Sequence, residues 1–169
     1  MQFENLFTPF KIGKVTVANR LCTSPMVTNF GDKSNAPSEK SLPYYRERAK
    51  GGWGMITTEA LHVTPSGNSF TAGLGLWDDA AIPRYAAITD TVHRYGDVKI
   101  FAQLNHSGRG ALETGFPAEA PSAIPCPSNG EVSPLALSRQ EIKDIVIAFG
   151  EAALRAKKSG LFDLDCGKI

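Results

Sequence analysis

The sequence has few cysteines, no long apolar run and no excess of one charge. Its three cysteines, Cys22, Cys126 and Cys166, lie far apart and form neither a Cys-x-x-Cys pair nor a zinc-ligand pattern. We therefore expect a reduced chain without a metal site. The net charge is +1 and the basic residues are scattered among acidic ones, so the chain lacks the basic surface that nucleic-acid binding requires.

Membrane and export signals are also missing. No apolar run approaches the roughly 18–20 residues of a membrane span, and residues 1–5 lack the charged and apolar regions of a signal peptide. We therefore expect a cytoplasmic protein with neither a membrane nor a nucleic-acid partner. The 169 residues, 42% of them hydrophobic and 21% charged, are typical of one globular domain.

The sequence predicts a small hairpin over residues 10–17, followed by strands that alternate with helices. A serine at a helix start, a proline in a first turn and a glycine after a helix mark the boundaries. Ser138 and Glu141 form a capping-box pattern. The expected strands cover residues 21–24, 54–59, 98–104 and 161–164, and the expected helices run from Ser38 to Lys50, from Pro83 to before Gly96, and from Ser138 to before Gly160.

This alternation predicts a parallel sheet with helical crossovers. The segments after the strands are long and those after the helices are short, which is typical of a barrel with its site at one mouth. A doubly wound sheet remains an alternative. It would favour a glycine-rich phosphate loop after the first strand, but residues 24–27, Ser-Pro-Met-Val, contain no glycine.

Several short motifs, taken in order, resemble the Old Yellow Enzyme family of NADH:flavin oxidoreductases. The resemblance covers about residues 5–160 and is closest to the bacterial branch that includes 2,4-dienoyl-CoA reductases. Larger members of that branch add an iron–sulfur cluster and a second nucleotide-binding domain. The motifs are Asn-Leu-Phe-Thr-Pro at 5–9, Asn-Arg at 19–20, Ser-Pro-Met at 24–26, Tyr-Tyr-Arg-Glu-Arg-Ala-Lys-Gly-Gly at 44–52, Thr-Glu-Ala at 58–60, Gln-Leu-Asn-His-Ser-Gly-Arg at 103–109 and Pro-Ser-Ala-Ile at 121–124.

The resemblance implies an FMN-dependent oxidoreductase of the ene-reductase type, in which hydride passes from NADH or NADPH through the flavin to an activated alkene. It implies that Pro25 and Met26 meet the flavin through their backbone groups. Ala60 leaves room for the ring, and Gln103 hydrogen-bonds the pyrimidine edge, which an amide suits because it both donates and accepts. The alternative is structural: Pro25 and Ala60 serve as turn and packing residues, and Gln103 is merely solvated.

Other residues are expected to be structural, or differ from the family pattern. Val27 stands where many relatives place Thr or Cys, so it cannot hydrogen-bond the flavin. We expect His106 to brace its loop rather than to act in catalysis. We also expect His62 to lie on a surface or helix face, and Cys22 to be a small apolar filler within its strand.

The catalytic residues remain unknown. Beyond Gly160 the family continues to a His-x-x-His or His-x-x-Asn pair, a proton-donor tyrosine, a flavin-binding arginine and phosphate-binding loops. Residues 161–169 contain no histidine and form a divergent tail. We expect this loss of similarity to reflect a frameshift, a split gene or a truncated product.

We therefore predict one partial domain over residues 1–169, the N-terminal half of a TIM (β/α)8 barrel with a leading β-hairpin. Half a barrel leaves open strand edges and an exposed apolar inner face, and both promote association. We expect a homo-oligomer or a complementing half-barrel chain to complete it. The functional alternatives are a truncated ene-reductase, a non-catalytic half-barrel that assembles with a partner, and a gene remnant.

Overall fold

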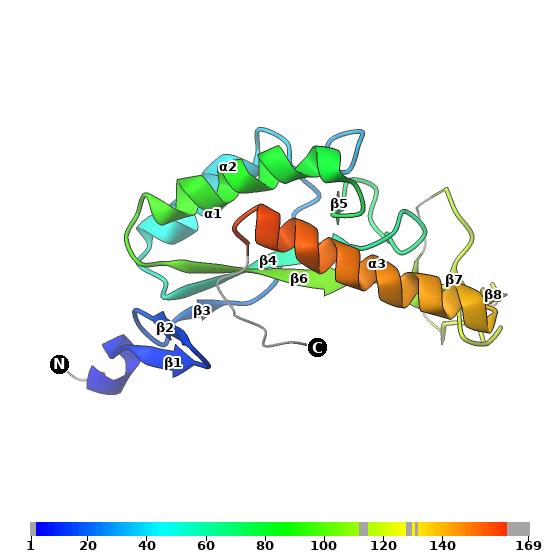
Figure 1. Cartoon of the computed structure of the whole chain (residues 1–169), viewed down its shortest axis with the longest axis horizontal. Helices are drawn as coiled ribbons and strands as arrows, with labels where there is room; N and C mark the ends of the chain where they lie inside the picture. Colours follow the sequence, from blue (N-terminus) through cyan, green and yellow to red (C-terminus); the bar gives the residue numbers. More distant parts are fainter. Residues whose placement is uncertain (1–2, 112–114, 128–129, 131, 162–169) are drawn as a thin grey trace.

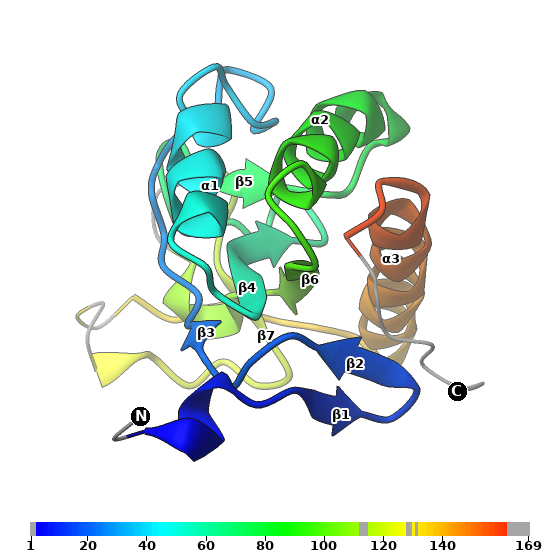
Figure 2. The same ribbon diagram turned by 90° about the vertical axis from the view of Figure 1, so that its left-hand side faces the viewer.

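The computed structural model describes residues 3–111, 115–127, 130 and 132–161. Three helices cover one face of a parallel sheet, and a small hairpin lies on the other side (Figures 1 and 2). The elements in chain order are η1 (Glu4–Phe7), β1 (Phe10–Ile12), β2 (Val15–Val17), β3 (Cys22–Thr23), α1 (Ser41–Lys50), β4 (Met55–His62), β5 (Leu74–Gly75), η2 (Asp79–Ala81), α2 (Ile82–His93), β6 (Lys99–Asn105), η3 (Gly108–Gly110), β7 (Glu119–Ala120), β8 (Leu135–Ala136) and α3 (Arg139–Lys158).

The hairpin is joined to the sheet by Asn19. Strands β1 and β2 pair antiparallel across a turn in which Gly13 has a φ of 58°, a conformation that glycine adopts without strain. The Asn19 side chain accepts hydrogen bonds from the N–H groups of Leu21, at 3.0 Å, and Gly54, at 2.9 Å, and donates to the Gly52 carbonyl at 2.9 Å. It therefore fixes the starts of β3 and β4 relative to each other.

The sheet follows the order of a barrel. Strand β4 pairs in parallel with β3 and with β6, and the short β5 also pairs with β4, at its carboxyl end. The expected fourth strand lies outside the described residues except for Leu161. That residue is fully buried, and its carbonyl accepts from the Ala102 N–H of β6 at 3.1 Å. The chain thus begins to extend the sheet beside its third barrel strand.

All three helices pack on the same face of the sheet. The core contains Ile56 and Ile100 from the strands, Tyr45 from α1, Ile88 from α2 and Ala152 from α3. In a doubly wound sheet with strand order 3-2-1-4-5-6, the third helix would lie on the opposite face and the fourth strand beside the first. The structure therefore favours the barrel arrangement over the doubly wound alternative.

The opposite face of the sheet differs from our expectation. We expected a broad apolar surface, but Phe101 is only 8% exposed and the residues with high exposure include Gln103 and Cys22. The prediction that Cys22 fills the strand interior is wrong. Its register partner is Met55, whereas the neighbouring pair Thr23–Ile56 faces the helices, so alternation turns Cys22 away from the core.

Helix boundaries agree with the sequence except at the start of α1. The prediction that Ser38 caps this helix is wrong, because the helix begins at Ser41. Ser38 instead forms a turn, in which its carbonyl accepts from the Ser41 N–H at 3.0 Å. The capping box of Ser138 and Glu141 is confirmed at the start of α3, and Gly160 ends that helix with a φ of 72°.

Helix α3 extends beyond the sheet at its amino-terminal end, towards β7 and β8 (Figure 1). Its buried residues, Ala152 and Ala156, lie in its carboxyl-terminal half. Three other apolar side chains of this helix, Val146, Ile147 and Leu154, are 57–65% exposed. An apolar surface on this helix therefore remains uncovered by the described residues.

Over the described ranges, no helix is long and apolar enough to cross a membrane, and no group of His, Cys, Asp or Glu side chains is arranged to hold a metal ion.

Candidate functional site

The segment after β3 carries two of the predicted site residues. Residues 24–27 have no regular secondary structure. Pro25 is half-buried, whereas Met26 is 62% exposed. Within the described chain, the N–H groups of Met26 and Val27 make no hydrogen bond, so they are available to donate to a ligand.

Ala60 and Gln103, the other two predicted residues, are direct register partners on β4 and β6. The pairing is irregular just before them, because Thr58 and Glu59 of β4 lie opposite the single residue Ala102 of β6. Such a β-bulge redirects the side chains around it. The structure thus places Ala60 and Gln103 side by side near the carboxyl ends of adjacent parallel strands, where barrel sites are built.

The two side chains differ in what they offer. Ala60 is half-buried and presents only a methyl group. Gln103 is exposed and its main-chain N–H donates to Thr58 Oγ1 at 3.1 Å. Its side-chain amide makes no hydrogen bond to another described residue, which leaves both a donor and an acceptor for a polar ligand edge.

Glu59 connects the two parts of the site. Its carboxylate accepts from the Thr28 N–H at 3.0 Å and from Thr28 Oγ1 at 2.5 Å, and its own N–H donates to Tyr45 Oη at 3.3 Å. Glu59 is 2% exposed. Burial raises the pKa of its carboxyl group, and the hydrogen bonds from Thr28 oppose that shift only in part. These bonds hold the segment after β3 against β4, beside Ala60.

His62 is placed differently from our prediction. It is fully buried at the end of β4, not on a surface. Its Nδ1 lies 3.0 Å from the Leu74 carbonyl and its Nε2 lies 3.5 Å from Ser107 Oγ. Burial lowers the pKa of His62. Its neutral ring therefore links the loops that follow β4 and β6.

His106 and Arg109 brace the loop after β6. His106 Nδ1 accepts from the Gly108 N–H at 3.1 Å, and its ring packs so closely on Gly67 that an added Cβ would lie 2.6 Å from Cδ2. Burial lowers the pKa of His106, and the Glu119 carboxylate, 3.9 Å from Nε2, opposes that shift. Arg109 donates to the Pro125 carbonyl at 3.2 Å. These contacts support the structural interpretation of His106.

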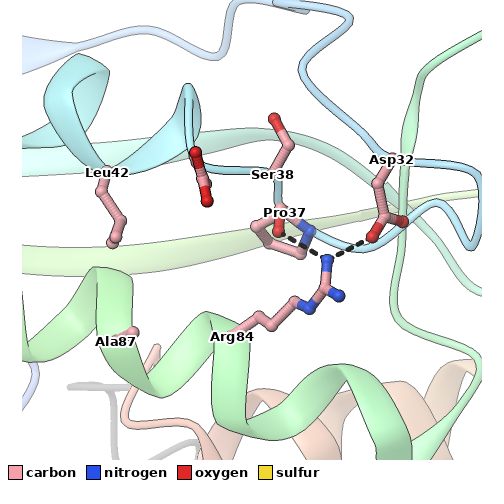
Figure 3. A pocket seen from close by; sticks show the side chains of 7 residues that line it. Asp32, Pro37, Ser38, Leu42, Arg84 and Ala87 are labelled. Atoms are coloured by element: carbon pink, nitrogen blue, oxygen red, sulfur yellow. Dashed lines mark hydrogen bonds and ion pairs between the residues drawn. The ribbon is translucent and has the colours of Figure 1, made fainter.

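A cavity of about 460 Å³ lies elsewhere, between the amino-terminal turns of α1 and α2 (Figure 3). There Arg84 pairs with Asp32 and donates to the Pro37 carbonyl at 3.2 Å. The Ser34 hydroxyl, with further help from Arg84, lowers the pKa of Asp32 to about 2. Its arginine is already paired with Asp32, and none of the predicted site residues lines this cavity.

A smaller cavity of about 280 Å³ lies between α3 and the loop after β6. Its walls are mainly apolar and include His106, Glu119 and Phe149. It too is lined by none of the four predicted residues.

The model of the NADH:flavin oxidoreductase / NADH oxidase family matches residues 5–164. The chain belongs to this family. It is 39% identical over 165 residues to an NADPH dehydrogenase of Bacillus licheniformis, covering 97% of this chain and 48% of that protein. It is 36% identical over 165 residues to an NADH oxidase of Thermoanaerobacter brockii, covering 95% of this chain and 25% of that protein.

The fold agrees with the family. The old yellow enzyme homologue from Zymomonas mobilis superposes with a TM-score of 0.82 and 31% identity, covering 92% of this chain and 46% of that one. The chain therefore spans about half the length, or less, of these relatives. The resemblance to the Old Yellow Enzyme family is confirmed, and the coverage supports a partial barrel.

The NADH:flavin oxidoreductase family uses FMN with NADH or NADPH as hydride donor, so the cofactor prediction is confirmed for the family. The matched relatives include a protein about twice the length of this chain and a much longer one. The assignment to one branch of the family thus remains a prediction.

Sequence reasoning did not find the residues that support the site. Thr28, Thr58 and Glu59 hold the segment after β3 and the bulge in place. One signal was available: a carboxylate in the interior of a strand must find hydrogen-bond partners if it is buried. The sequence alone could not show which residues those partners are.

Proposed function

We propose that this chain forms part of the FMN site of an NAD(P)H-dependent oxidoreductase of the ene-reductase type, acting on a small activated alkene. The chain's own residues fit the cofactor. Unpaired backbone N–H groups at Met26 and Val27, a small side chain at Ala60 and an unpaired amide at Gln103 lie around one mouth of the sheet.

Each residue has a distinct role in this proposal. Pro25 and Met26 line the ring with backbone groups. Ala60 leaves space for close approach of a flat ring, and Gln103 donates to and accepts from a polar heterocycle edge. Bound FMN supplies hydride transfer between the nicotinamide and the alkene. The catalytic acid and the residues that polarise the alkene are not assigned among residues 1–161.

The observation that carries the proposal is the register pairing of Ala60 with Gln103. It places a methyl group next to an unpaired amide, at the strand ends where barrel enzymes bind their cofactors. Packing alone would not require a glutamine at position 103, beside the bulge, because its side-chain amide has no hydrogen-bond partner among the described residues.

A titration of the purified chain with FMN, followed by flavin fluorescence and the visible spectrum, tests the proposal. Gln103→Leu removes the amide at similar size, and we expect FMN binding to weaken about tenfold, the effect of losing roughly 1.4 kcal/mol of hydrogen bonding. Gln140→Leu, on the exposed start of α3, serves as the control. Absence of FMN binding by the unmodified chain, or equal binding by both variants, would contradict the proposal.

We further propose that the chain assembles, either with a second copy or with a chain that supplies the other barrel strands. The exposed apolar side chains Val146, Ile147 and Leu154 on α3 favour this proposal, because large apolar patches mark interaction surfaces. Light scattering after size exclusion measures the mass. We expect an oligomer that Val146→Lys together with Leu154→Lys dissociates, and a stable monomer of the unmodified chain would contradict assembly.

The rival interpretation is a half-barrel without catalysis, or a gene remnant. The same measurements separate these possibilities. Assembly without flavin binding supports the non-catalytic module, while an aggregating product without a cooperative unfolding transition supports the remnant.

A further inference from the structure

The segment that carries Pro25 and Met26 is held at its carboxyl end by a bidentate contact. Both the main-chain N–H and the hydroxyl of Thr28 donate to the Glu59 carboxylate, at 3.0 and 2.5 Å. The Thr28 hydroxyl oxygen in turn accepts from the Phe30 N–H at 3.2 Å. Thr28 therefore uses three hydrogen bonds to fix the path of the chain just after Met26.

The residues immediately before this contact have no such restraint. Within the described chain, the N–H groups of Met26 and Val27 are unpaired, and the Met26 side chain is 62% exposed. Because these N–H groups are unpaired, the position of the segment depends strongly on what holds its ends. On one side it follows β3, whose pairing with β4 ends at Thr23, and on the other side it ends at Thr28.

Glu59 is an unusual choice if its purpose is stability alone. Its side chain is buried, and the Thr28 groups are its only hydrogen-bond donors among the described residues. Burying a carboxylate is costly, and an apolar side chain of similar volume is often as stable or more so. A charged acceptor instead makes short, directional bonds, which fix geometry better than apolar packing does.

The position of Glu59 in β4 strengthens this argument. It lies in the bulge, one residue before Ala60, and Ala60 is in register with Gln103. The same strand thus fixes the segment after β3 through Glu59 and forms the mouth of the sheet through Ala60. A displacement at Glu59 would change the distance between the two parts of the site.

We infer that Glu59, acting through Thr28, is a positioning residue that sets residues 25–27 against Ala60 for contact with the flat ring of a bound flavin. This inference rests on the proposed function for the identity of the ligand. The contact between Glu59 and Thr28 is independent of the proposed function, because it can be measured in the FMN-free chain.

Three variants test the inference. Glu59→Leu removes both acceptors while keeping most of the volume, Thr28→Val removes the hydroxyl at equal size, and Thr28→Ser is the conservative control that retains the hydroxyl. Amide hydrogen exchange, measured by NMR on the FMN-free chain, reports on the segment. FMN titration reports on the site.

We expect the Thr28 amide to exchange at least tenfold faster in Glu59→Leu, and the Phe30 amide to do so in Thr28→Val. Amides of Lys99 and Ala102 in β6, which donate to the Gly54 and Leu161 carbonyls, should keep their protection in both variants. FMN should bind about tenfold more weakly to both, and Thr28→Ser should restore native exchange and binding. A role limited to stability would instead speed exchange in β6 as well and leave FMN affinity unchanged in the folded fraction.

The failures are distinguishable. If exchange at Thr28 and Phe30 is unchanged while the unmodified chain binds FMN, the positioning role is refuted and the proposed function stands. If exchange responds as expected but the unmodified chain binds no FMN, the contact with Thr28 is real, while the proposed function and the flavin-positioning role are both refuted.

Discussion

The main-chain N–H of Gln103 donates to the side-chain oxygen of Thr58 at 3.1 Å, where the pairing of β4 with β6 is interrupted by one additional residue. Thr58 is buried, and its hydroxyl also donates to the Glu59 carbonyl at 2.9 Å. A side chain here replaces the carbonyl that a regular ladder would provide. The bulge is therefore satisfied internally, and Gln103 keeps its place beside Ala60.

Replacement of Thr58 by valine should destabilise the chain. The substitution keeps the shape but leaves the Gln103 N–H without its partner, and we expect a loss of about 1–3 kcal/mol in the free energy of unfolding. Urea denaturation measures it. Thr57→Val, one residue earlier on β4 and at a position without a side-chain hydrogen bond to the described chain, is the control and should change stability little. Equal losses in the two variants would contradict the assigned role.

Gly160→Ala should be destabilising, whereas Gly150→Ala should be stabilising. At Gly160 the φ of 72° disfavours an L-residue, and an added Cβ would lie 2.8 Å from Thr89 Cγ2. We expect a cost of about 1–2 kcal/mol there. At Gly150, within α3, an added Cβ meets nothing within 4 Å, so alanine should gain about 0.5–1 kcal/mol. Thermal unfolding of the pair checks both signs, and a shared sign would refute this account of the Gly160 turn.

Asn19→Ala should loosen the junction between the hairpin and the sheet. The variant loses the two bonds that the side chain accepts from Leu21 and Gly54 and the one it donates to Gly52. At about 0.5–1.5 kcal/mol for each of the three bonds, we expect a loss of roughly 1.5–4.5 kcal/mol. Asn5→Ala, near the same terminus, is the control for denaturant unfolding. A loss below that of the control would show that water replaces these bonds.

Stability should fall as the pH drops below the ordinary titration range of histidine. Burial lowers the pKa of both His62 and His106, so the unfolded chain binds more protons than the folded chain below about pH 6.5. The stabilising contribution is thus present above that pH and is lost as the pH falls towards the folded-state values.

The variant His62→Asn measures how much of the stability lost at low pH is due to His62. An asparagine amide can still donate to the Leu74 carbonyl but does not titrate. The unfolding free energy measured at pH 7.5 and pH 5 should therefore fall less in the variant than in the unmodified chain, because the contribution of His62 is removed. A steeper fall in His62→Asn would refute the assignment.

The regular elements could be predicted because each is encoded by neighbouring residues. The Ser138–Glu141 box and the turn at Gly160 define α3 from within its own sequence. The prediction that Ser38 caps α1 was wrong because a serine before a helix can form either a cap or a preceding turn. The backbone conformation decides between the two. The helical face of α2, with Tyr85, Ile88 and Val92 buried, agrees with its apolar spacing.

The supporting contacts of the site could not be predicted, because they depend on register. The additional residue at Thr58 and Glu59 leaves no periodic signal, since a bulge changes only which residues face each other across two strands. Thr28 and Glu59 are 31 positions apart, and only the parallel pairing of β3 with β4 brings them together. His62 was misplaced for the same reason: its burial is produced by β5 and the loop after β6, not by its neighbours in the sequence.

The hydrogen bond from Ala102 to the Leu161 carbonyl has a consequence for engineering. The turn at Gly160 and this bond together place Leu161 beside β6. That position is consequently a natural junction for chimeric barrels, at which the remaining strands of a related enzyme could be grafted in phase with the first three. The fusion would need no redesign of the crossover, because α3 and its terminal glycine already deliver the chain to the edge of β6.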